Sequence, residues 1–208
     1  ALPPLSALDA CLCMGASIGM ASGAERAQGK EFSKGTVAVL GDSTFLHSGV
    51  TPLIDAVYNQ QAITVMILDN RITGMTGHQQ NPASGKDIHN APAPAVDLKK
   101  LCESCGVSSV RVVDPFDLKG VEQALREETA RDAVSVIIAQ RACALLVHDN
   151  PPPYTIEGCK NCGMCMKLSC PAIERREKQV VINPALCIGC GMCAQVCPFH
   201  AIKEGVRA

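Results

Sequence analysis

The sequence predicts an α/β fold, with a parallel sheet over most of the chain and a small α+β module at its C-terminal end. Short apolar runs alternate with helical stretches from about residue 10 to residue 147, which is typical of a parallel sheet covered by helices on both faces. Eight of the thirteen cysteines lie between Cys159 and Cys197. We therefore expect two domains, over residues 1–150 and 151–208.

Four apolar runs in the first domain are short enough to be doubly buried strands. They are TVAVL at 36–40, ITVMILD at 63–69, VSSVRVV at 107–113 and VSVIIA at 134–139. We expect helices over 50–59, over 98–105 and over 118–130, the second ended by Gly106 and the third opened by Asp117 as N-cap.

Two Pro-rich stretches lie outside these elements. Residues 81–97 have no periodic pattern, and a loop of this length in a compact domain is usually functional or mobile, so we expect it to cover a site. Pro151, Pro152 and Pro153 end the first domain, because successive Pro residues fit neither a helix nor a central strand.

Composition excludes several classes of function. Nineteen Lys and Arg against twenty Asp and Glu give a formal net charge of -1, so we expect no binding to nucleic acid or to an acidic membrane. Apolar residues make up 47% of the chain, yet no run approaches the roughly 18 apolar residues of a membrane span. We expect a cytoplasmic protein without a secretory signal, and Ala1 in place of Met indicates processing or truncation.

The C-terminal cysteines form an internal duplication with a repeat of 28 residues. Cys159, Cys162 and Cys165 are followed by Cys170 and Pro171, and the second copy has the same order. Three thiolates at this spacing bind one 4Fe-4S cluster, and the Cys before Pro reaches the other cluster in two-cluster ferredoxins. The predicted ligands are therefore, for cluster one, Cys159, Cys162, Cys165 and Cys197, and for cluster two, Cys187, Cys190, Cys193 and Cys170.

A zinc site or a disulfide framework is the alternative for these cysteines, but two complete four-Cys sets favour clusters. The gap between Cys165 and Cys170 is one residue longer than usual, and we expect a local bulge there. This segment resembles bacterial-type ferredoxins over its whole length.

Polar residues follow two strands of the first domain directly. Gly41, Asp42 and Ser43 come after the run at 36–40, and Asn70 follows the run at 63–69. Ligands bind at the carboxyl ends of strands in open α/β sheets, and an Asp with an Asn can supply oxygen ligands to Mg²⁺, which would hold a diphosphate. A capping role for Asp42 is the alternative.

The stretches CLCMGASIGMASG, GDSTFLHSGVTPLIDAVYN and LDNRITGMTGHQQNP, taken together and in order, resemble the thiamine diphosphate-binding domain of 2-oxoacid:ferredoxin oxidoreductases. The resemblance is strongest to the alpha subunit of the indolepyruvate-type enzymes, and it covers practically the whole chain. It implies Mg²⁺ bound by Asp42, Asn70 and the backbone carbonyl of Ile72. The implied cofactor contacts are Cys13, Met14, Gly15, Gly41, Asp42, Ser43, Asn70, Ile72, Thr73, Gly74 and Met75, with Thr76 and Gly77 completing the loop.

Some of these residues have simpler interpretations. Met14 could fill the core instead of supporting the cofactor, and His47 and His78, candidate acid–base or carboxylate contacts, could be structural hydrogen-bonders. Cys102 and Cys105 have a zinc-like spacing, but without a second pair we expect buried thiols.

The resemblance implies thiamine-dependent oxidative decarboxylation of an aryl pyruvate to an acyl-coenzyme A, with electrons passing through two 4Fe-4S clusters to an external ferredoxin. A separate beta subunit and an anaerobic metabolism are implied too. The family's alpha subunit carries a further thiamine-type domain with an activating Glu, so we expect little activity from these 208 residues alone. A non-oxidative thiamine-dependent decarboxylase and an electron-transfer module with a degenerate thiamine domain remain as rivals.

Overall fold

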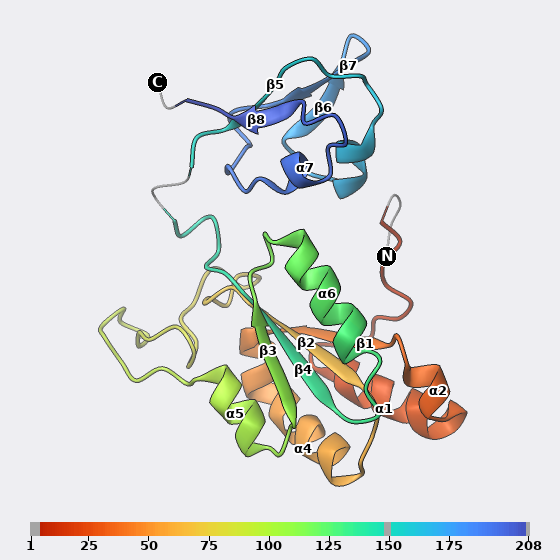
Figure 1. The fold of residues 1–208 in the computed structure, drawn as a ribbon. Helices are drawn as coiled ribbons and strands as arrows, with labels where there is room; N and C mark the ends of the chain where they lie inside the picture. Colours follow the sequence, from red (N-terminus) through yellow and green to blue (C-terminus); the bar gives the residue numbers. More distant parts are fainter. Residues whose placement is uncertain (1–4, 148–150, 207–208) are drawn as a thin grey trace. The chain divides into compact units, whose positions relative to one another are not determined.

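The computed structural model describes residues 5–147 and 151–206. The chain divides into two compact units, one of Cys11–Cys143 and one of Ala144–Ala208 together with the residues up to Ala10. The division falls a few residues before the Pro run, and residues 148–150 of the predicted boundary lie outside the described residues. Both units are drawn in Figure 1.

The first unit is built on a four-stranded, entirely parallel sheet in the order β1-β2-β4-β3. Its strands are β1 (Val37–Gly41), β2 (Thr64–Asp69), β3 (Ser109–Val113) and β4 (Ser135–Gln140). All four lie on the predicted apolar runs, which confirms the predicted strands. The central strand β4 is buried along five of its six residues, as expected for a strand covered on both faces.

Helices cover the sheet in the pattern that a βα alternation requires (Figure 1). They are α1 (Ala16–Gln28), α2 (Lys30–Ser33), α3 (Asp42–Thr44), the π-helix η1 (Phe45–Gly49), α4 (Val50–Tyr58), α5 (Leu98–Ser104) and α6 (Leu118–Glu128). Residues of α1, α4 and α5 share one core with Leu40, Ile67 and Ile138 of the sheet. Helix α6 packs on β3 and β4.

The helix ends follow their sequence signals. The side chain of Asp117 accepts a hydrogen bond of 3.1 Å from the Gly120 amide and begins α6, which satisfies one of the free N–H groups of the first turn. Asp97 does the same for α5 through the Lys100 amide. In α5, Cys102 is fully buried and Cys105 partly so. Burial raises the pKa of the Cys102 thiol to about 12. The expectation of buried thiols is confirmed for Cys102 and only in part for Cys105.

The second unit contains two antiparallel strand pairs, β5 (Tyr154–Ile156) with β8 (Ile202–Glu204) and the hairpin of β6 (Ile173–Arg176) with β7 (Gln179–Ile182). Between them lie the 3-10 helix η2 (Met164–Leu168) and the short helix α7 (Met192–Gln195). Cysteine side chains and a few branched residues form its small core. No helix within the described residues has both the length and the apolar character needed to cross a membrane.

Candidate functional site

The carboxyl edge of the sheet brings two buried acids together. Gly41, the last residue of β1, pairs with Leu68 of the neighbouring strand β2. Asp42, which follows β1, therefore lies next to Asp69, which ends β2. Their exposures are 2% and 1%. Burial raises the pKa of Asp42, hydrogen bonds from Asn81 and the Ser43 amide lower it, and the Asp69 carboxyl raises it again. Two acids held this closely out of water favour a bound cation.

Asp42 begins a continuous helical segment, because α3, η1 and α4 follow one another without a break. Gly41 ends β1 with an extended backbone at φ -78°, and Asp42 lies in the first turn. The free N–H groups of a helix start attract anions. A π-helical turn such as η1 is rare and is found mostly at functional positions.

Asp69 is held by three donors. The Arg71 amide donates to Oδ1 at 3.1 Å, the Gln140 side chain donates to Oδ2 at 2.8 Å, and the Arg71 guanidinium forms an ion pair with Oδ2 at 3.2 Å. These contacts fix the point where β2 gives way to the long loop. The Arg71 guanidinium therefore balances the negative charge of Asp69. Asp42 forms no ion pair within residues 5–147 and 151–206, so its charge has no such partner there.

Asn70 starts a tight turn. Its side-chain oxygen accepts a hydrogen bond of 3.1 Å from the Ile72 amide, and its carbonyl accepts one of 3.0 Å from Cys143. Ile72 is buried. Gly74 lies against the Asn70 side-chain amide, because a Cβ at Gly74 would be 3.8 Å from Asn70 Nδ2. The predicted ligands Asn70 and Ile72 thus belong to one turn at the end of the strand next to Asp42.

The loop that follows folds back onto the site. Asn81 Nδ2 donates to Asp42 Oδ2 at 3.0 Å, and Arg71 reaches the Ala83 carbonyl at 3.0 Å. Asn81 and Ala83 are buried, whereas Met75 is 88% exposed and His78 is exposed. The predicted loop therefore touches the acid pair with its first residue, while its covering role stays a prediction.

The Cys13, Met14 and Gly15 element packs on the same helical segment. Gly15 has φ +86°, and a Cβ there would lie 2.1 Å from Ser48 Oγ of η1. Only a residue without a side chain fits this approach. Cys13 is exposed and Met14 is 57% exposed, so Met14 does not fill the core within the described residues. His47, also in η1, is exposed.

The cysteines of the second unit gather into two groups that each combine both repeats. Cys159, Cys162, Cys165 and Cys197 line one pocket together with apolar residues. Burial raises the pKa of the Cys165 thiol, and the other three cysteines raise it further. Burial, with Cys190, Cys187 and Cys170, raises the pKa of Cys193 to about 11. Cys197 thus lies with the first three cysteines of repeat one, and Cys170 lies near Cys193 of repeat two. The assignment of these cysteines to two clusters stays a prediction.

The two repeats share their local backbone. Gly163 and Gly191, both left-handed, precede η2 and α7. Backbone amides donate to sulfur in the first group, from Asn161 to Cys159 at 3.3 Å and from Ala201 to Cys197 at 3.4 Å. The extra residue before Cys170 is accommodated where Ser169 takes a left-handed conformation at φ 51°.

No three His, Cys, Asp or Glu side chains approach closely enough to hold a single metal ion in the part of the chain that the structure describes. A cubane cluster spaces its four thiolates across its own width, so its ligands lie farther apart than those of one ion. The donor chemistry of each group, four thiols with amide N–H groups aimed at sulfur, fits such a cluster.

Sequence reasoning missed two site residues. Asp69 ends a strand beside Asn70 at the sheet edge, and this position was the available signal. Asn81 lies in the loop after β2, and its hydrogen bond to Asp42 spans 39 residues, which no local pattern reveals.

Comparisons with known proteins agree with both units. Residues 2–139 match the family described as thiamine pyrophosphate enzyme, C-terminal TPP binding domain, and residues 180–203 match the 4Fe-4S binding domain. Subunit IorA of indolepyruvate oxidoreductase from Methanothermobacter marburgensis is 40% identical over 99% of this chain and 33% of its own length. The same subunit from Archaeoglobus fulgidus is 37% identical over 96% of this chain and 33% of its own.

The chain thus spans about a third of the length of these relatives. Among solved structures, the 2-oxoglutarate:ferredoxin oxidoreductase from Magnetococcus marinus, with 2-oxoglutarate, coenzyme A and succinyl-CoA bound, aligns with a TM-score of 0.54 at 16% identity. The alignment covers 62% of this chain and 46% of that one. At this identity the likeness concerns the fold.

Proposed function

Because the chain belongs to the thiamine pyrophosphate enzymes, we propose that it is part of a 2-oxoacid:ferredoxin oxidoreductase of the indolepyruvate type. In this proposal the first unit binds the diphosphate end of thiamine diphosphate, and the second unit holds two 4Fe-4S clusters. The observation that carries it is the presence of both parts in one chain, a thiamine-type sheet and a duplicated four-cysteine module.

The chain's own residues suit the magnesium diphosphate group. Asp42 supplies a buried carboxylate that lacks an ion-pair partner in the described residues, and a divalent cation would compensate it. We propose Asp42, the Asn70 side chain and the Ile72 carbonyl as ligands, with Gly41 and Ser43 beside the diphosphate. Asn81 and Asp69 orient this set without being proposed as ligands.

Bound thiamine diphosphate supplies a nucleophilic carbon for addition to a 2-oxo acid and for loss of carbon dioxide. The chain's part is to fix the cofactor at its diphosphate and to exclude water from the acid pair. The exposed residues Met14, His47, Met75 and His78 are proposed to line the space beyond the diphosphate. Burial and the neighbouring cysteines raise the pKa of the Cys165 and Cys193 thiols, and bound iron would compensate the charge of the thiolates.

The proposal assigns an aryl pyruvate such as indolepyruvate as substrate, coenzyme A as acyl acceptor, a beta subunit as partner and an external ferredoxin as electron acceptor. The similarity to the archaeal indolepyruvate oxidoreductase subunits supports these assignments. The proposed oxidation removes two electrons from each substrate molecule. Each 4Fe-4S cluster accepts one electron, so two clusters can accept both.

Visible absorption under anaerobic conditions tests the proposal on the intact enzyme with its partner subunit. Adding indolepyruvate and coenzyme A should bleach the iron–sulfur band, and pyruvate or 2-oxoglutarate should bleach it more slowly. Asp42→Ala should abolish bleaching by substrate and keep bleaching by dithionite. Asp55→Ala, at an exposed Asp of α4, is the control and should behave like the unaltered enzyme. Bleaching by dithionite alone in the unaltered enzyme would refute the proposed reaction.

A further inference from the structure

The two cysteine repeats differ sharply in charge. Residues 183–199, which contain three predicted ligands of cluster two and Cys197, include no Asp, Glu, Lys or Arg. The first repeat carries Lys160 and Lys167, where the second has Ile188 and Gln195 at the matching positions. If cations were needed only to balance an anionic cluster, both repeats would carry them.

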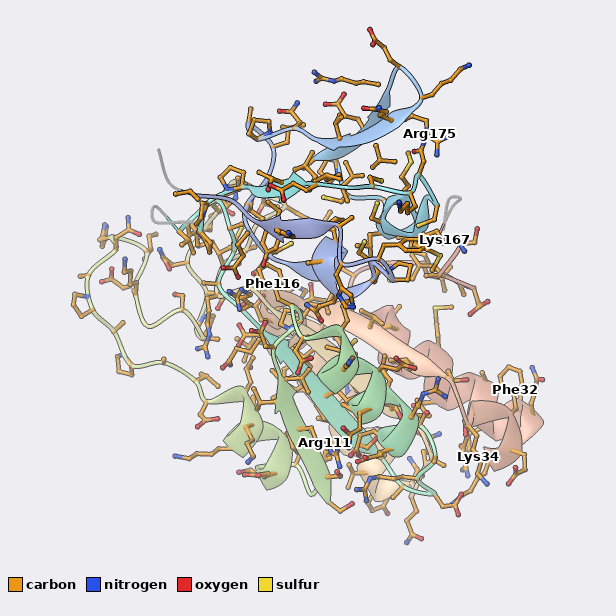
Figure 2. All side chains as sticks on the ribbon, turned by 45° about the horizontal axis from the view of Figure 1, so that its top comes forward. Phe32, Lys34, Arg111, Phe116, Lys167 and Arg175 are labelled. Atoms are coloured by element: carbon orange, nitrogen blue, oxygen red, sulfur yellow. The ribbon has the colours of Figure 1, made fainter. Side chains whose placement is uncertain are left out.

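Two more cations lie beside the first repeat. The side chain of Arg175 in β6 lies next to Gly163, because a Cβ at Gly163 would be 3.8 Å from Arg175 Nη2. Lys178 follows in the β6–β7 turn, where its carbonyl accepts a hydrogen bond from the Asn161 side chain. Figure 2 shows Arg175 and Lys167 on the same side of the module, on β6 and η2, which pack together.

These four cations have no acidic partner among the residues that the structure describes. All four are exposed, and none of them forms an ion pair within the described residues, whereas Arg176 pairs with Glu174 and Lys203 with Glu157. Two acids lie among them in sequence, Glu174, which pairs with Arg176, and Glu177 at the tip of the turn. We call Lys160, Lys167, Arg175 and Lys178 the basic rim.

The basic rim lies beside an exposed apolar centre at the predicted cluster one, since Lys160 lines the same pocket and Arg175 lies near Gly163, another of its lining residues. Met164 is 40% and Phe199 52% exposed, and both line the pocket of the first cysteine group. Cys159 and Cys162 are exposed, whereas no cysteine of the second group is. Within that second group, Gly189 lies against Pro151 and Gly191 against Tyr154, so neighbouring chain segments cover it. An apolar centre with a charged periphery is the usual anatomy of a transient protein interface.

We propose that an acidic iron–sulfur electron carrier docks on the basic rim, and that cluster one is the cluster from which electrons leave. This rests on the proposed function for the presence of the clusters and adds the docking surface and the direction. Each transfer moves one electron: reduced cluster one returns to its oxidised state, the carrier's iron–sulfur centre is reduced by one electron, and no bond or proton changes place. Opposite charges accelerate such encounters and make them sensitive to salt.

Binding to an oxidised, acidic two-cluster bacterial ferredoxin tests the docking surface on the intact enzyme. The dissociation constant is measured at ionic strengths of about 0.01 M and about 0.15 M. Lys160→Ile with Lys167→Gln places in repeat one the residues that repeat two carries. This variant should weaken binding about tenfold at low ionic strength and lose most of the salt dependence.

Two controls keep the result interpretable. Lys203→Gln removes a positive charge outside the basic rim and should leave the dissociation constant unchanged. Arg175→Gln with Lys178→Gln removes rim charges outside the cysteine loop, so it tests the rim even where the loop variant fails to assemble clusters. Iron content and the visible spectrum report that assembly.

Electron transfer from dithionite-reduced enzyme gives the second readout and needs no 2-oxo acid. The rate to the acidic ferredoxin should fall with added salt, and the rate to cationic cytochrome c should rise with it. Equal rates and salt dependence in the rim variants and the unaltered enzyme would overturn the docking proposal. If those variants no longer associate with the second subunit, the basic rim binds that subunit and not the electron carrier, and the docking proposal is wrong. Failure of the proposed function appears separately, as clusters that dithionite reduces and substrate does not.

Discussion

The side chain of Asn81 donates a hydrogen bond of 3.0 Å to Oδ2 of Asp42, although 39 residues separate them. Asn81 is itself 6% exposed, and its own Oδ1 accepts from the Ala83 amide at 2.9 Å. The long loop after β2 therefore starts by fixing the orientation of the buried acid at the end of β1.

Asn81→Ala should raise the dissociation constant of thiamine diphosphate with Mg²⁺ about tenfold, because a buried hydrogen bond of this type contributes about 1–3 kcal/mol when its partner is left unsatisfied. Titration calorimetry measures the change. Asn59→Ala, at a half-buried Asn that caps the end of α4 and bonds to Asp55, should leave the affinity unaltered. Equal affinities in the two variants would show that Asp42 needs no support from the loop.

Asp42→Asn should stabilise the cofactor-free protein, since it removes one of two neighbouring buried acids. The same change should abolish the rise in thermal midpoint that Mg²⁺ with thiamine diphosphate produces in the unaltered protein, a rise that EDTA should reverse. Thermal unfolding with and without the ligands gives both numbers. A midpoint in the variant that still rises with Mg²⁺ and cofactor would place the ligand elsewhere.

Gly15→Ala should destabilise the protein by about 2–4 kcal/mol, because a left-handed backbone is strained for Ala and the added Cβ would overlap Ser48 Oγ. Gly23→Ala is the matched control within α1, where a Cβ meets nothing within 4 Å, and it should stabilise by about 0.5–1 kcal/mol. Urea unfolding measures both.

Combining Gly15→Ala with Ser48→Gly separates the two causes. The double variant removes the overlap and keeps the strained backbone, so it should recover only part of the loss. Full recovery would mean that the left-handed conformation costs nothing at this position.

Glu128→Ala should destabilise the first unit by about 2–3 kcal/mol. Glu128 is fully buried and pairs with Arg111 at 2.8 Å and with Arg131 at 2.7 Å. This loss of stability is smaller than the loss expected if Glu128 and both arginines were fully buried. Both arginines are partly exposed, so water can solvate them once Glu128 is removed. Glu122→Ala breaks the exposed pair with Arg126 and should cost about 0.5 kcal/mol or less. Similar losses in the two variants would contradict this reasoning.

The sequence by itself determined the four strands of the first unit and its helices α4, α5 and α6. Branched apolar runs placed β1 to β4, and Asp117 marked the start of α6, because strands and caps depend on neighbours within a few residues. The spacing of the cysteines likewise indicated two groups that exchange their fourth member, since ligand spacing along the chain reflects the backbone turn around each group.

Only the tertiary structure decided which side chains complete the site. The contacts of Asn81 with Asp42 and of Gly15 with Ser48 join segments that have no common periodicity, and the pairing of Asp69 with Gln140 joins two strands 71 residues apart. Such contacts depend on how the sheet and the loops pack in three dimensions. The exposure that distinguishes the two cysteine groups has the same origin, because Pro151 and Tyr154 cover one of them and neither residue belongs to a cysteine repeat.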